Sequence, residues 1–292
     1  IPLTKKSQAD MHSFGNLSIL NPSKKPILPP MANPVIERGF IAVNSFPELK
    51  NIPIIIGECD PEGCAACSEK REPRYAYRNG TMYSSYTAAS FARIYELADK
   101  YKVNLKGAVS WSFEFEDQEW FAGFRDLATN GVDKPVLNVF RMFGMMKGNR
   151  LAAVTEKGFT AQDIIANGVR AQRDIYALAS KDDRSIMVMI WNYHDNDLPS
   201  DANDIILQIN NISNKKVLVE HFRVDQQFSN SFEKWKEIGR PQQVTNEQFK
   251  ILEQSGQLAM MNSPEWKQTE KGFLKINFML PAQAVSLVRI SW

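Results

Sequence analysis

The 292-residue chain lacks several features that would each point to a class of protein. No uninterrupted apolar stretch approaches the roughly 18 residues of a membrane span, so we predict no membrane partner. The net charge is only +2, from 35 basic and 33 acidic residues, so no nucleic-acid partner is indicated. Internal repeats and low-complexity tracts are also absent. At 43% hydrophobic and 23% charged residues, the composition is that of a soluble globular protein.

The beginning of the chain carries no targeting signal. Residue 1 is isoleucine, and no basic-then-apolar leader follows it. The compartment therefore stays open, with a periplasmic or secreted location preferred. Residues 1–35 are rich in proline, serine, asparagine and lysine, which predicts an irregular connection.

Helix and strand patterns alternate through the first half of the chain. The apolar periodicity predicts, in order, a helix from Pro34, a strand over 52–58, a helix over 81–101, a strand over 105–113 and a helix from Pro135. This order is typical of parallel βα units. Two such strands are too few for a complete eight-stranded barrel.

The pattern changes after about residue 150. Short, partly alternating β segments are predicted at 175–179, 186–193, 205–209, 217–222, 273–278 and 285–290, with helical insertions at 231–238 and 245–258. These segments favour antiparallel sheets packed face to face. We therefore predict an α/β part over residues 1–148 and an all-β sandwich domain over residues 149–292.

Glu58 is the most informative residue. It closes the apolar run that begins at Ile52, which predicts a buried parallel strand. A carboxylate at the end of such a strand costs free energy unless something there needs it. In α/β barrels the carboxyl ends of the strands form the active site. Glu58 is thus a candidate catalytic carboxylate, and the alternative is a solvated glutamate at the start of a loop.

Trp111, Glu114 and Glu116 follow the second predicted strand. Consecutive strand ends of a barrel lie side by side, so these residues are expected to face Glu58 across one pocket. Aromatic rings stack on sugar rings and carboxylates bind hydroxyl groups, so we predict a sugar-binding role for them. The alternatives are a core position for Trp111 and a solvated charge for at least one of the two glutamates.

Cys64 and Cys67 have the spacing of a redox or metal half-site. No second pair accompanies them, and a zinc site would need Cys59 plus a distant histidine. A local disulfide that braces the loop and reduced structural thiols are the remaining alternatives. We predict no metal and no cofactor.

Two further polar segments are assigned structural roles. We predict that His194 is a surface or interface residue. Asp225 and residues 229–232 are expected to provide turn and N-cap interactions, with Asn230 or Ser231 capping the helix that contains Trp235.

The segment Ile54–Cys67 resembles the nucleophile strand and loop of the β-xylosidases of glycoside hydrolase family 39. The likeness extends from about Pro34 to the C-terminus. It is carried further by Tyr77–Tyr83, Trp111–Glu116, Phe121–Arg125, Asp133–Arg141, His221–Asp225 and Ser229–Asn230.

The resemblance implies a (β/α)8 TIM barrel with an appended β-sandwich. It implies hydrolysis of β-xylosides, or of iduronides in the family's other branch, with retention of configuration. Glu58 matches the nucleophile at the end of the seventh barrel strand, and Trp111 matches the eighth-strand residue that lines the sugar subsite. A retaining mechanism needs a second carboxyl group about 5–5.5 Å away.

The chain departs from the family at the acid/base residue, which is a glutamate that follows an asparagine at the end of the fourth strand. The only Asn-Glu pair here is Asn246–Glu247, which lies in the β region before a helix. The first barrel strands are absent as well. The resemblance therefore implies the C-terminal part of a xylosidase, without a general acid whose contribution is typically about 10²–10⁴-fold.

The expected partners are a β-xyloside or xylo-oligosaccharide from xylan breakdown and the missing N-terminal barrel segment. Without that segment, strand edges and barrel-facing apolar side chains should be exposed. The alternatives are a non-catalytic carbohydrate-binding or structural module, an iduronidase-like glycosidase, and a metal or redox protein built on the three cysteines.

Overall fold

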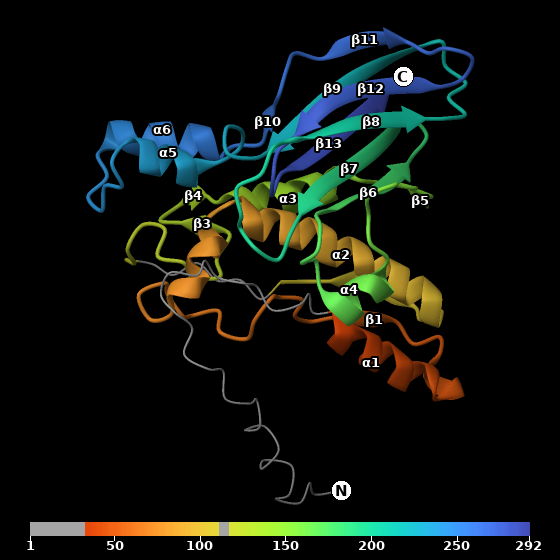
Figure 1. Ribbon diagram of the computed structural model, residues 1–292, viewed down its shortest axis with the longest axis horizontal. Coiled ribbons are helices and arrows are strands. Elements are labelled where there is room, and N and C mark those ends of the chain that lie inside the picture. The colour runs from red at the N-terminus through yellow and green to blue at the C-terminus, as the bar shows by residue number, and fades with distance from the viewer. Residues whose placement is uncertain (1–32, 111–116) are drawn as a thin grey trace, which may run out of the picture.

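A central antiparallel sheet organises the chain in a computed structural model that describes residues 33–110 and 117–292 (Figure 1). Its strand order is β10-β9-β13-β7-β6-β5, and β11 also pairs with β9. These strands are β5 (Asn149–Leu151), β6 (Asp174–Lys181), β7 (Ser185–Tyr193), β9 (Lys216–Val224), β10 (Ala259–Met260), β11 (Glu265–Gln268) and β13 (Val285–Ser291). Helices cover one face of this sheet, and a second, two-stranded sheet covers the other.

The α/β part contains the predicted helix and strand order. Its elements are α1 (Asn33–Asn44), the short 3-10 helix η2 (Pro47–Leu49), β1 (Ile54–Ile56), the 3-10 helix η3 (Pro73–Asn79), α2 (Thr81–Tyr101), β2 (Leu105–Ala108) and α3 (Pro135–Met145). Strands β1 and β2 pair in parallel, which places Ile56 opposite Ala108. The sequence-based prediction of parallel βα units is confirmed for these two strands.

Strand β7 lies between the two cores, and all nine of its residues are buried. Met189, Trp191 and Tyr193 face α2 and α3, and the ring of Tyr193 meets the edge of Tyr86 at a centroid distance of 5.9 Å. Ala89 and the other small residues of α2 let this helix approach the sheet closely. Burial on both faces explains why the strand is continuously apolar instead of alternating.

The opposite face of the sheet packs against the pair β8 (Asn203–Ile209) and β12 (Leu274–Leu280). In β12 the side chains of Leu274 and Ile276 point into the core, and the alternating residues Lys275 and Asn277 are exposed. The two strands therefore carry the alternation expected of a sheet with one buried face. All six predicted β segments of this half are confirmed as strands.

Shorter elements connect the layers. The predicted helical insertions are confirmed as α5 (Ser231–Glu237) and α6 (Asn246–Gly256), and Asn230 caps α5 by accepting a 3.1 Å hydrogen bond from the Glu233 amide. The sequence analysis missed helix α4 (Ala161–Asn167) and the hairpin of β3 (Ala128–Thr129) and β4 (Val132–Asp133). Helix α4 begins at a capping box formed by Thr160 and Asp163, a signal that the sequence does contain.

The prediction of a fully buried strand ending in Glu58 is wrong in one respect. Strand β1 covers only three residues, and its Ile55 is 67% exposed. Among the described strands β1 pairs only with β2, so no element covers the outward side of Ile55. Val109, just after β2, is 49% exposed for the same reason. Strands β1 and β2 therefore leave apolar side chains exposed.

The prediction of His194 as a surface or interface residue is also wrong. His194 is 8% exposed, and its ring nitrogens lie 3.2 Å from the carbonyl oxygens of Arg170 and Asn196. Gln283 donates a 2.8 Å hydrogen bond to the His194 carbonyl. The strand end turns inward against these loops, so His194 belongs to the interior.

Within residues 33–110 and 117–292 we find no helix with the length and hydropathy of a transmembrane segment.

A buried ion pair joins α2 to the sheet. The guanidinium of Arg93 donates to both carboxylate oxygens of Asp174, at 3.0 and 3.1 Å, and both side chains are fully buried. The Trp191 indole also donates to Asp174, at 2.8 Å. Because neither side chain is solvated, the Asp174 charge depends on Arg93 for compensation, and Arg93 is compensated by Asp174 together with Glu96.

We expect Asp174→Ala to destabilise the protein by about 3–5 kcal/mol, because it removes the buried partner of Arg93 and leaves that charge with only the partly exposed Glu96. The matched control is Asp99→Ala, which removes an exposed partner of Arg150 and should cost about 1 kcal/mol or less. The free energy of unfolding in urea measures both. Equal losses for the two variants would contradict the proposed importance of the buried pair.

His221 on β9 is held neutral inside the β part. Burial lowers its pKa from 6.5 to about 4, and the nearby Arg223 charge acts in the same direction. Its Nε2 lies 2.9 Å from Ser286 Oγ, which accepts a hydrogen bond from Arg223 at 2.8 Å. The Ser286 hydroxyl can therefore donate to the unprotonated ring of His221.

Acid should destabilise the fold through His221. The unfolded chain takes up a proton below about pH 6.5, whereas the folded protein does so only below about pH 4. Stability should therefore fall by up to about 3 kcal/mol between these pH values and be fully present above pH 6.5. Unfolding curves of the wild type and His221→Gln across this range measure the difference. Parallel pH profiles would show that the ring is not responsible.

Candidate active site

Glu58 lies two residues beyond β1, where the ends of β1 and β2 meet. The Val109 amide donates to the Ile56 carbonyl at 3.0 Å, and the Cys59 amide donates to the Val109 carbonyl at 2.9 Å. These bonds extend the parallel pairing up to Glu58. Its side chain is 35% exposed, which allows it to reach a ligand. The expectation that the two strand ends lie side by side is confirmed.

Arg125 binds the carboxylate of Glu58. Its Nη2 donates to Glu58 Oε1 at 2.6 Å, and its Nη1 lies 3.4 Å from Asp60 Oδ2. The Nη1 also donates to the Glu62 carbonyl oxygen. The Arg125 side chain is fully buried, so its charge has to be compensated by these partners. The guanidinium therefore fixes the orientation of the Glu58 carboxylate.

Asp60 connects this arrangement to α2. The Ser110 hydroxyl donates to Asp60 Oδ1 at 2.5 Å, and the Tyr83 hydroxyl lies 3.5 Å from the same oxygen. Burial raises the pKa of Tyr83, and the Asp60 carboxylate adds to this effect. Tyr83 therefore keeps its proton at neutral pH and serves as a donor.

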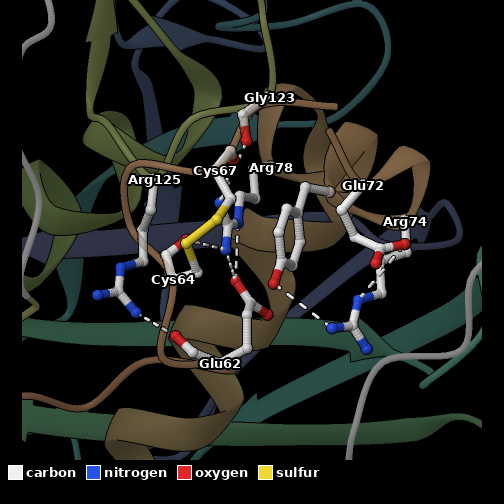
Figure 2. The surroundings of a disulfide bond; sticks show 9 residues. Glu62, Cys64, Cys67, Glu72, Arg74, Arg78, Gly123 and Arg125 are labelled. Carbon is white, nitrogen blue, oxygen red and sulfur yellow. Dashed lines mark hydrogen bonds and ion pairs between the residues drawn. A yellow bond between two sulfur atoms is a disulfide. The ribbon is translucent and has the colours of Figure 1, made fainter. Parts of the chain in front are cut away.

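The loop after Glu58 is closed by a disulfide between Cys64 and Cys67 (Figure 2). Arg78, from η3, lies beside it, and its guanidinium points toward the carbonyl groups of Cys64 and Cys67. Arg78 donates to Glu62 Oε1 at 2.7 Å and stacks over the Tyr75 ring at 3.8 Å. Of the alternatives for the cysteine pair, the structure contains the local disulfide.

The third cysteine takes no part in that bond. Cys59 is buried, with its Sγ 3.8 Å from Ser90 Oγ, and burial raises the pKa of its thiol to about 12. At neutral pH it is therefore a thiol and a poor metal ligand. Among the residues that the structure describes, no three histidine, cysteine or acidic side chains group as a metal site.

The loops that follow β1 and β2 are joined by Asn79 and Gly123. The Asn79 side chain donates to the Phe121 carbonyl at 2.7 Å and accepts from the Gly123 amide at 3.2 Å. Gly123 has φ +79°, and a Cβ there would come within 3.0 Å of the Glu69 backbone nitrogen. Glycine is thus required both for its conformation and for the close approach of the two loops.

The other predicted site residues, Trp111, Glu114 and Glu116, lie outside the described residues. The structure adds Arg125, Asp60 and Arg78, which the sequence analysis did not assign to the site. The signal available for Arg125 was its place directly after Phe124, because an arginine that is buried beside apolar residues needs a partner for its charge.

We expect Gly123→Ala to destabilise the protein by about 2 kcal/mol or more, because strain at positive φ is added to contact with the Glu69 backbone. The control is Gly239→Ala, where φ is +91° but no atom lies within 4 Å of the added Cβ. It should cost about 1 kcal/mol. Thermal unfolding compares the two, and equal shifts would show that the contact between the loops contributes nothing.

Several solved structures share the fold of this chain at low sequence identity. A monomeric β-xylosidase from Caulobacter crescentus has a TM-score of 0.65 at 14% identity, over 88% of this chain and 48% of that one. A family 39 enzyme from Xanthomonas axonopodis pv. citri has a TM-score of 0.64 at 13% identity, over 88% and 48%. A bacterial orthologue of human α-L-iduronidase has a TM-score of 0.70 at 15% identity, over 89% and 46%.

These likenesses show a shared fold, which in the neighbours contains a TIM barrel and a β domain. The chain spans less than half the length of each of the three structures. No curated protein matches the sequence significantly. The sequence profile of glycosyl hydrolases family 39 matches residues 35–269, which is most of the chain. This match shows that the chain belongs to glycosyl hydrolase family 39, a family of glycosidases.

Proposed function

We propose that the chain forms the nucleophile side of a retaining glycoside hydrolase that acts on β-xylosides. The observation that carries this proposal is the position of Glu58. Its carboxylate follows a parallel strand, remains partly exposed, and is bound by the fully buried Arg125 at 2.6 Å. Membership of a glycosidase family supports the assignment of this carboxylate as the nucleophile.

In the proposed mechanism, Glu58 forms a covalent bond to the anomeric carbon of the sugar. Among the described residues Arg125 binds Glu58 Oε1, so we assign Oε2 as the attacking atom. A second carboxyl group gives its proton to the leaving oxygen as the glycosidic bond breaks. The same group then takes a proton from water, which displaces the sugar from Glu58 with overall retention.

The second carboxyl group is proposed to come from other barrel strands. The Asn-Glu pair at Asn246–Glu247 opens helix α6, and Glu247 is exposed there, in the β part and away from β1. We propose that an N-terminal barrel segment docks beside β2 and supplies the acid/base residue. A cavity of about 510 Å³ lies next to β2, and it is lined by Leu105, Ala108, Phe140 and Phe143 among others.

Under this proposal residues 1–148 complete a TIM barrel with that segment, and residues 149–292 form the β-sandwich domain. Trp111, Glu114 and Glu116 are proposed to contact the sugar. Around Glu58 the described groups include the carboxylates of Asp60 and Glu62, whose charges oppose Arg125 and Arg78.

An iduronidase-like glycosidase is the second candidate. It is favoured by the TM-score of 0.70 to the bacterial iduronidase orthologue, which exceeds the 0.65 to the β-xylosidase. Rates of hydrolysis of an aryl β-xyloside and an aryl iduronide by the complete enzyme decide between them. Sugar binding without hydrolysis of either would instead indicate a carbohydrate-binding module.

In the complete enzyme, Glu58→Ala should abolish hydrolysis of an aryl β-xyloside, because no glycosyl-enzyme can form. Added azide fits the space left by the carboxylate and should restore turnover, with glycosyl azide as the product. Glu247→Ala, which removes an exposed carboxylate far from β1, is the control and should retain wild-type rates. Near-normal turnover by Glu58→Ala would overturn the nucleophile assignment.

A further inference from the structure

We propose that the disulfide-closed loop over residues 62–67 is a brace that positions Arg125 against Glu58, and that reduction of the disulfide slows formation of the glycosyl-enzyme. The inference rests on the proposed role of Glu58. It adds Arg78 as a positioning residue, and it makes the rate of glycosyl-enzyme formation depend on whether the disulfide is oxidised or reduced.

One set of carbonyl groups in this loop binds Arg78 (Figure 2). Arg78 Nη2 donates to the Cys64 carbonyl at 2.8 Å, and Nη1 donates to the Cys67 carbonyl at 3.1 Å. The disulfide holds the Cα atoms of the two cysteines 5.5 Å apart, which lets both carbonyls converge on one guanidinium. Arg78 Nη1 also donates to the Gly123 carbonyl, at 3.3 Å, in the loop that carries Arg125.

Other carbonyl groups of the same loop bind Arg125. The Arg125 amide donates to the Ala65 carbonyl at 3.0 Å, and Ala65 lies between the two cysteines. The Arg125 guanidinium donates to the Glu62 carbonyl. The loop thus presents the carbonyls of residues 62 and 65 to Arg125 and those of residues 64 and 67 to Arg78. A change in the shape of the loop would disturb both guanidinium groups.

The side chain of Glu62 fixes the position of Arg78 next to the disulfide loop. Its carboxylate binds Arg78 and accepts a hydrogen bond from the Tyr77 hydroxyl. The Arg78 side chain is fully buried and that of Glu62 is 12% exposed, so the pair is shielded from solvent. Breaking such a pair leaves an uncompensated buried charge. The closed loop is therefore held in one conformation as long as the disulfide is intact.

Reduction would proceed through Cys64, the less buried cysteine of the pair. A dithiol attacks Cys64 Sγ through its thiolate, the bond between the two sulfurs breaks, and Cys67 leaves as a thiolate that takes up a proton. The second thiol of the reductant then releases Cys64 as a thiol. The dithiol is oxidised to its cyclic disulfide by two electrons, and the protein gains two protons. The carbonyls of residues 64 and 67 are then no longer held together.

The test isolates the nucleophilic step with 2,4-dinitrophenyl 2-deoxy-2-fluoro-β-xyloside. This reagent needs no proton on its leaving group, so its rate of labelling reports Glu58 and not the acid/base residue. The rate constant at saturating reagent is measured in the complete enzyme by intact mass, with and without dithiothreitol. Reduction should lower it by about 10–100-fold, the cost of a misplacement on the order of 1 Å.

Matched variants separate the disulfide from other thiols and from the fold. The double variant Cys64→Ser with Cys67→Ser should be labelled as slowly as the wild type in dithiothreitol. Its labelling rate should not change when dithiothreitol is added. Cys59→Ser should keep the full response to the reductant, since it leaves the disulfide intact. Arg78→Met should label as slowly as the reduced enzyme with the disulfide present, and Arg78→Lys should recover part of the rate. Thermal midpoints confirm that each protein is folded at the assay temperature.

Equal labelling rates in the oxidised and reduced folded enzyme would overturn the brace. If reduction unfolds the enzyme, the comparison of Arg78→Met with wild type decides, and an unchanged rate there overturns it equally. Failure of the proposed function has a different signature. In that case no sugar becomes attached to Glu58 even in the oxidised wild type.

Discussion

Buried guanidinium groups have to be compensated, and this constraint determines how the parts of the chain are joined. Arg78, Arg93 and Arg125 are each fully buried, and each binds a carboxylate from a different segment. Arg93 joins α2 to the central sheet, Arg125 joins the loop after β2 to Glu58, and Arg78 fastens the loop between them. Since leaving any of these charges unpaired is costly, each pair favours the packing that holds its two segments together.

The sequence predicted those features whose cause is local. The periodicity of residues 81–101 identified α2 with its observed ends, and of the two predicted caps of α5, Asn230 and Ser231, the structure contains Asn230. Contacts between residues distant in the sequence could not be predicted from local patterns. Arg125 and Glu58 are 67 positions apart, and Arg93 and Asp174 are 81 apart. No local pattern states which carboxylate a buried arginine will find.

The two errors have one physical cause. An apolar run predicts burial at Ile55, and a polar residue at a strand end predicts exposure of His194. The structure reverses both, with Ile55 at 67% and His194 at 8% exposure. Burial depends on what packs against a residue, and this is decided by the arrangement of elements. Strand β1 has a neighbour on one side among the described strands, whereas the loops around His194 close over its ring.

The two carboxyl groups of the proposed retaining site have different physical requirements. A nucleophile must hold one oxygen in place before the sugar arrives, and a group fixed by a buried ion pair does so without reorganising during the reaction. Here the groups that orient Glu58 come from the loops after β1 and β2, which Asn79, Arg78 and Gly123 join within this chain. The acid/base residue has the opposite requirement, since it must both give and take a proton. Under the proposed mechanism, placing the two carboxyl groups on separate segments would let each environment be set independently, and the buried arginines would set that of the proposed nucleophile.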